Sequence, residues 1–149
     1  MYKHILVPTD GSETAWRGVE EGLRLAKALG SKVTAVTATE PFPASGLALG
    51  AGWVPTQDDM DYYNTAHKQA AMDILQAVKA SAQETGVDAA IVYVPYSRPS
   101  DAIVETAQQR GCDVIVIASH GRRGINKLLL GSQATEVLAR ARMPVLIVK

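Results

Sequence analysis

The sequence predicts an α/β fold in which residues 1–149 form a single domain around an open, parallel five-stranded sheet. Short apolar runs alternate with segments of helical periodicity, which is typical of repeated strand–helix–strand units. The runs are continuous rather than alternating in polarity, so we expect helices on both faces of the sheet. Right-handed crossovers favour the strand order 3-2-1-4-5. The expected strands are Ile5–Val7, Val33–Ala38, Ala89–Val94, Val114–Ile117 and Val145–Val148.

Four helices are expected between these strands. Each begins at a residue favoured at helix starts, a serine, threonine or proline, and the first three end at a glycine. Their expected ranges are Ser12–Gly30, Thr56–Gly86, Pro99–Gly111 and Ser132–Arg142.

Helical spacing predicts which faces of these helices are buried. The second helix carries one stripe, formed by Met60, Tyr63, His67, Ala71, Ile74 and Val78. A histidine on such a stripe favours a hydrogen-bonded core residue over a metal ligand, and none of the three histidines has metal-ligand spacing. In the fourth helix the residues expected to face inward are Ala134, Val137, Leu138 and Ala141.

The segment Pro41–Pro55 does not fit this rhythm, because it holds three prolines, three glycines and an isolated Trp53. We expect a long loop there. Trp53 would either stack on a ligand or anchor the loop, and the sequence leaves both alternatives open.

Composition excludes several classes of protein. Fifteen basic and fifteen acidic residues cancel, which argues against a general nucleic-acid binder. The single cysteine, Cys112, excludes a disulfide within the chain and suits a reducing cytoplasm. The apolar run before Pro8 is too short for a signal peptide, and no stretch is long enough for a membrane span. We therefore expect a cytoplasmic protein without a membrane partner.

Two loops mark the expected ligand site. In an open parallel sheet, ligands bind at the carboxyl ends of the strands where the strand order reverses, here between strands one and four. Pro8-Thr9-Asp10-Gly11-Ser12 follows strand one, and Ala118-Ser119-His120-Gly121-Arg122-Arg123-Gly124 follows strand four. A phosphate cradle is one interpretation of the second loop. It would consist of the glycines, the basic side chains including Lys127, and the helix start at Gly131-Ser132. On composition alone, a surface loop explains these residues equally well.

The spacing from Ala118-Ser119-His120-Gly121 through nine residues to Gly131-Ser132 resembles the nucleotide motif of the universal stress protein family. The opening Ile5-Leu6-Val7-Pro8-Thr9-Asp10-Gly11-Ser12 and the closing Pro144-Val145-Leu146-Ile147-Val148 are similar to that family as well. The resemblance covers nearly the whole chain and implies an adenine nucleotide alpha hydrolase-like fold.

The resemblance also implies roles for individual residues. Asp10 would accept hydrogen bonds from ribose hydroxyls, while Pro8, Thr9 and Ala38 would border the adenine. The phosphates would be held from the second loop and the following helix, with Mg²⁺ accompanying ATP and no tightly bound metal ligated by the protein. The expected nucleotide-binding residues are Pro8, Thr9, Asp10, Ala38, Ala118, His120, Gly121, Arg122, Arg123, Gly124, Gly131, Ser132 and Gln133.

Two positions depart from the family pattern. Ala118 replaces the first motif glycine, so its methyl group could crowd the ligand, or force a shift if φ is positive there. Tyr96-Ser97-Arg98 stands where relatives often have a glycine. His120 is expected either to touch phosphate or to make a structural hydrogen bond.

These observations favour a stress-response regulatory protein that binds ATP or another adenine nucleotide. The alternatives are a stress protein that acts by protein–protein contact without nucleotide, and a slow ATPase. No nucleophile with a positioned base is evident, so no catalytic residue is assigned and at most slow ATP hydrolysis is expected. The apolar edge strand Val145–Val148 predicts a homodimer, since unpaired strand edges tend to associate.

Overall fold

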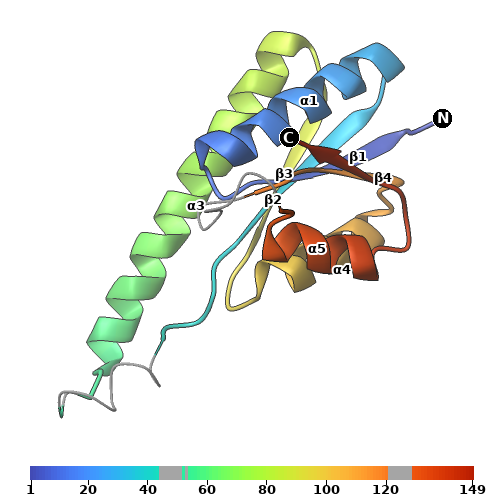
Figure 1. The fold of residues 1–149 in the computed structure, drawn as a ribbon. Coiled ribbons are helices and arrows are strands. Elements are labelled where there is room, and N and C mark those ends of the chain that lie inside the picture. The colour runs from blue at the N-terminus through green and yellow to red at the C-terminus, as the bar shows by residue number, and fades with distance from the viewer. Residues whose placement is uncertain (44–51, 53, 121–128) are drawn as a thin grey trace.

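The computed structural model describes residues 1–43, 52, 54–120 and 129–149. Its helices and strands follow the predicted alternation (Figure 1). In chain order they are β1 His4–Pro8, α1 Glu13–Leu29, β2 Lys32–Ala38, α3 Gln57–Thr85, β3 Ala89–Val94, α4 Pro99–Arg110, β4 Val114–Ala118, α5 Ser132–Arg140 and β5 Val145–Val148. Most of the segment Pro41–Pro55, including Trp53, lies outside the described residues.

The strands form one parallel five-stranded sheet in the order β3-β2-β1-β4-β5, which confirms the predicted order. Alternate residues of each central strand point to opposite faces, so two apolar layers result. Ile5 and Val7 pack in the layer beneath α1 and α3. Leu6 packs in the layer beneath α4 and α5. Figure 1 shows the two helix pairs on opposite faces of the sheet.

The predicted N-caps of α1 and α3 are present, whereas α5 has Gly131 as its N-cap and Ser132 as its first residue. The Ser12 hydroxyl accepts a hydrogen bond from the Ala15 N–H at 3.1 Å. Thr56 and Asp59 form a reciprocal capping box at the start of α3. Helices α1, α3 and α4 end at glycines with positive φ, the conformation that a left-handed cap requires. The chain therefore turns sharply at these points to enter the next strand.

The fourth predicted helix needs two corrections. Helix α5 ends at Arg140, because Ala141 already has extended backbone angles. Leu138 does not face inward: it is 51% exposed, whereas Ala134 and Val137 are buried. The next position after Val137 is rotated by about 100° around the helix, which carries Leu138 off the buried face of so short a helix.

Candidate functional site

A cleft of about 390 Å³ opens at the carboxyl ends of β1, β2 and β4, between helices α3, α4 and α5. It lies at the reversal of strand order, and its volume is within the range of about 300–1,000 Å³ usual for small-molecule sites. Nine of the expected site residues line it: Pro8, Thr9, Asp10, Ala38, Ala118, His120, Gly131, Ser132 and Gln133. Gly121, Arg122, Arg123 and Gly124, together with Lys127, lie outside the described residues.

The loop after β1 is held in a defined conformation. The Thr9 carbonyl oxygen accepts a hydrogen bond of 2.8 Å from the Thr37 hydroxyl, and the Thr9 hydroxyl accepts one of 3.1 Å from the Gly11 N–H. The Asp10 carboxylate accepts the Ser12 N–H at 2.9 Å. Gly11 has a φ of 79°, which a residue with a side chain adopts only with strain. The loop thus presents Asp10 at the cleft directly before the start of α1.

The start of α5 forms the opposite side of the cleft. The Gly131 N–H donates to the Ser119 carbonyl oxygen at 2.7 Å, so it already has a partner within the protein. A Cβ atom at Gly131 would lie 2.8 Å from that same oxygen, which explains the glycine by packing. Gly131 is the N-cap and has no side chain to cap the helix. The donors at the positive end of α5 therefore belong to the next residues, from Ser132 onward.

His120 lies on the cleft wall and makes a structural hydrogen bond. Its Nδ1 atom is 3.0 Å from the hydroxyl oxygen of Ser119, whose residue is buried. The Ser119 N–H also donates to the Val148 carbonyl oxygen at 2.7 Å, which continues the ladder beyond β4. The bond to Ser119 holds the imidazole in position, and this is compatible with ligand contact on the cleft side.

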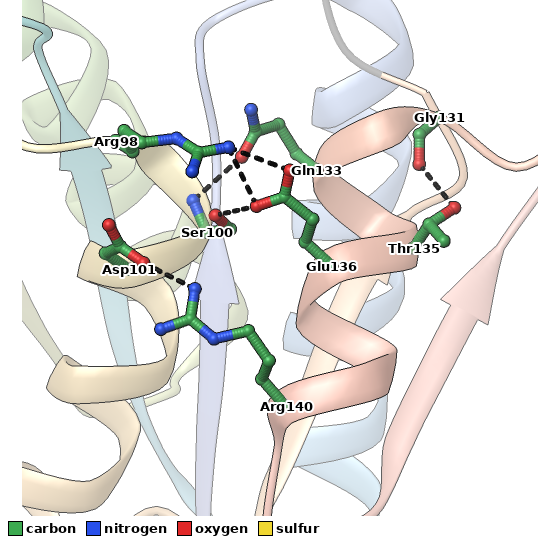
Figure 2. A network of polar contacts seen from close by, with 8 residues as sticks. All are labelled: Arg98, Ser100, Asp101, Gly131, Gln133, Thr135, Glu136 and Arg140. Atoms are coloured by element: carbon green, nitrogen blue, oxygen red, sulfur yellow. Dashed lines mark hydrogen bonds and ion pairs between the residues drawn. The ribbon is translucent and has the colours of Figure 1, made fainter.

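A polar network joins α4 to α5 beside the cleft (Figure 2). The buried Ser100 donates its N–H to the Gln133 side-chain oxygen at 2.8 Å and its hydroxyl to the Glu136 carboxylate at 2.6 Å. Glu136 also accepts from Arg98 at 2.8 Å, and Arg140 pairs with Asp101 one turn further on. Gln133 therefore supplies a cap to α4, whose own N-cap residue makes no side-chain cap. The network fixes the first turn of α5 relative to α4.

Ala118 does not strain the backbone at the first motif position. Among the described residues, the non-glycine position with positive φ is Tyr96, so Ala118 has an ordinary φ. A Cβ atom built on Gly18 of α1 would lie 3.5 Å from the Ala118 Cβ and 2.9 Å from its N atom. The absence of a side chain at Gly18 thus makes room for the backbone of β4 at Ala118, while the 3.5 Å separation from the Ala118 methyl group would be an ordinary contact.

The cleft also includes residues that the sequence reasoning missed. They come from the end of β2, from α3 and from α4: Thr37, Thr39, Glu40, Tyr63, Ala70, Ile74, Pro99, Ala102 and Ile103. His67 needs a correction, because it is an exposed residue on the cleft and is not buried in the core. The length of the predicted second helix, compared with the short strands beside it, was the available signal that part of its stripe would pass the edge of the sheet.

Two negative findings apply to the described part of the chain. No group of three or more histidine, cysteine, aspartate or glutamate residues is arranged there to hold a metal ion. None of its helices combines the length and the apolar character that crossing a membrane requires.

The fold and the cleft define an open parallel α/β protein with a cavity at its topological switch point. The family model described as the Universal stress protein family matches residues 1–149. The chain belongs to this family.

Curated relatives and solved structures agree with that assignment. Universal stress protein MJ0531 of Methanocaldococcus jannaschii is 31% identical over 149 residues, covering 100% of this chain and 83% of the relative. A solved structure of the protein MJ0577 has 27% identity and a TM-score of 0.78, covering 100% of this chain and 96% of that one. A crystal structure of a universal stress protein in complex with cAMP has 27% identity and a TM-score of 0.68, covering 99% and 96%.

Proposed function

We propose that this protein is a stress-response regulator that binds ATP or another adenine nucleotide in the cleft between β1 and β4. The observation that carries the proposal is the meeting of the Asp10 loop and the start of α5 on one cleft. A carboxylate suits ribose hydroxyls, and a helix start suits phosphate. The structural relative in complex with cAMP supports the adenine nucleotide as the class of ligand.

The proposed roles follow from chemistry and position. Asp10 accepts hydrogen bonds from the ribose, Pro8, Thr9 and Ala38 border the base, and Ser132 with the first N–H groups of α5 binds phosphate. Because Gly131 donates to Ser119, its role is to bring the helix start close to the cleft. Gln133 contributes through the part of its amide that does not cap α4.

With ATP bound, Mg²⁺ would be held chiefly by the phosphates, as is usual for this ion in nucleotide sites. His120, Ala118 and the residues 121–124 complete the proposed site. This assignment of individual residues is part of the proposal and rests on the family likeness together with the lining of the cleft.

Calorimetry with AMP, ADP and Mg-ATP tests the proposal, together with mass spectrometry of any nucleotide released on heat denaturation. We expect one site per chain. Ser132→Asp places a carboxylate at the first turn of α5, where it suits the helix dipole but repels phosphate. It should weaken nucleotide binding at least tenfold.

Ser132→Asn is the matched control, since it has the same shape without the charge and should retain most of the affinity. A Gly131 substitution is unsuitable, because its Cβ would displace the Ser119 carbonyl before any ligand was present. Absence of binding at millimolar nucleotide would overturn the proposal and favour action by protein–protein contact alone.

Two further parts of the proposal concern context. To none of the described cleft residues do we assign the role of a base for hydrolysis, so a regulator rather than a dedicated ATPase is proposed, with slow hydrolysis as the alternative. A homodimer through β5 is proposed because this strand ends the sheet and leaves Leu146 41% exposed. A cytoplasmic location is proposed because the single cysteine suits a reducing compartment.

A further inference from the structure

Helix α3 is much longer than the strands that it covers. Its 29 residues span about 43 Å at the usual helical rise, whereas the seven residues of β2 span about 23 Å. Buried residues occur only in its second half, at Ala71, Leu75, Val78 and Ala82. Figure 1 shows the first half of α3 extending past the sheet, alongside the chain that leaves β2. This overhang lies at the cleft end of the molecule.

The inner face of the overhang is a wall of the cleft. Tyr63, His67, Ala70, Ala71 and Ile74 all line the cavity, at the spacing of a single helix face. The Tyr63 and His67 rings are stacked at a tilt, with centroids 3.9 Å apart. Phe42, in the segment after β2, meets the Tyr63 ring edge to face at 5.1 Å. The aromatic wall, defined here as Tyr63 and His67, is thus braced from a second segment.

The two sides of the cleft differ in chemistry. The α5 side offers a helix start and a hydroxyl, which suit an anion. The α3 side offers two aromatic rings followed by apolar side chains, which add little to phosphate binding but pack well against a flat heterocycle. A ligand that fits both sides carries phosphate at one end and an aromatic base at the other.

We propose that the aromatic wall is a specificity determinant that recognises the base of the bound nucleotide and favours a purine, which has the larger stacking area. This inference deepens the proposed nucleotide function and rests on it. It adds Tyr63 and His67 to the base-bordering residues that the family likeness implies, and it gives the overhang of α3 a function that its packing does not explain.

The test compares AMP, CMP and ribose 5-phosphate, which share the phosphate and the ribose but differ in the base. Tyr63→Ala and His67→Ala should each weaken AMP binding about tenfold in calorimetry, weaken CMP binding less, and leave ribose 5-phosphate binding within twofold. On AMP addition, the ring protons of His67 should shift upfield in NMR spectra, whereas ribose 5-phosphate should leave them in place.

The same helix provides matched controls. Tyr62 neighbours Tyr63 but is 79% exposed and does not line the cleft, so Tyr62→Ala should bind AMP like the wild type. Gln69 follows His67 by two positions, is exposed and does not line the cleft, so Gln69→Ala is the control for His67→Ala. Far-UV circular dichroism checks that each variant is folded.

Four results would overturn the inference. Equal losses for AMP and ribose 5-phosphate would assign the wall a role in shaping the cleft rather than in reading the base. Unchanged AMP affinity in both wall variants would remove it from the site. A wild type that binds ribose 5-phosphate as tightly as AMP would refute base recognition but keep the phosphate site. A wild type that binds neither of them, and neither ADP nor Mg-ATP, would overturn the proposed function as well.

Discussion

The two ends of the sheet are built for different tasks from the same strands. At the amino end, side chains close the structure: the His4 ring is 2.7 Å from the Thr34 hydroxyl, and Asp113 accepts the backbone N–H groups of Lys3 and His4. The Ser31 hydroxyl donates to the Tyr2 carbonyl oxygen at 2.6 Å. At the carboxyl end, the cleft of about 390 Å³ remains between the helices. The amino end is thus closed by hydrogen bonds, whereas the carboxyl end keeps an open cleft.

Helix direction explains this division. In a parallel sheet with helical crossovers, each helix ends near the amino end of the next strand and begins near the carboxyl end of the previous one. Compact glycine caps such as Gly30 and Gly111 therefore occur at the closed end. The positive helix starts gather at the open end, where an anion can use them.

Helix α3 crosses both regions, so substitutions along it measure the difference most directly. Leu75 is fully buried in the core beneath α3, and Leu75→Ala should lower the free energy of unfolding by about 2–5 kcal/mol. Urea unfolding measures this loss. Nucleotide affinity of the folded variant should change less than twofold, because Leu75 does not line the cleft.

Ile74→Ala, at the neighbouring position, is compared with Leu75→Ala in the same urea unfolding experiment. Ile74 is half-buried and faces the cleft, so the stability loss should be well under that of Leu75→Ala. If the two variants lost equal stability, the proposed difference between the packing face and the cleft face of α3 at this point would be wrong.

A smaller change in the free energy of unfolding is expected for a substitution at Tyr96, which follows β3 and has a φ of 55°. The left-handed region costs a residue with a Cβ about 1–2 kcal/mol, and glycine avoids that cost while gaining flexibility in the unfolded chain. Tyr96→Gly should therefore raise the free energy of unfolding by roughly 0.5–1 kcal/mol. Thermal and urea unfolding check the sign of this change.

Ser97→Gly controls for chain flexibility, because Ser97 has no positive φ and the variant should lose stability. A stability loss in Tyr96→Gly would mean that contacts of the tyrosine outweigh the backbone strain. The exposed position of Tyr96 argues against that outcome.

The features that sequence reasoning predicted are those that depend on local chemistry or on chain order. Caps such as Ser12 and Thr56 and the strand order follow from residue types and crossover handedness. Contacts between distant segments were not predictable. Gln133 caps Ser100 across 33 positions, and no spacing rule links them.

The stripe on α3 is a second case in which a local sequence pattern does not predict a tertiary contact. Periodicity places His67 and Val78 on one face, but it does not tell where the sheet ends. Val78 meets the sheet and is buried, whereas His67 lies beyond the sheet and lines the cleft. The pattern was correct, and the inference that the whole stripe is core was wrong.

The smallest predicted effect is a pH dependence of the free energy of unfolding, caused by His4 at the amino end of the sheet. Burial lowers the pKa of His4 below the usual 6.5, and the positive charge of Lys32 lowers it further, while Asp113 opposes the shift. The folded protein thus prefers the neutral ring more strongly than the unfolded chain does. Above about pH 6.5 the ring is neutral in both states and its contribution to stability is complete. As the pH falls through 6.5 towards the folded pKa, the unfolded chain gains the proton first and stability decreases.

Urea unfolding of the wild type between pH 8 and pH 5 should therefore show a stability loss that is smaller in His4→Gln, which has no titrating ring. Lys32→Gln should also reduce the loss, since it removes the second cause of the lowered pKa. Both residues lie at the amino ends of β1 and β2, remote from the cleft lining, so the change concerns folding rather than the ligand site. A pH profile of stability in His4→Gln that matched the wild type would contradict this prediction. It would show that groups other than His4 cause the loss of stability at low pH.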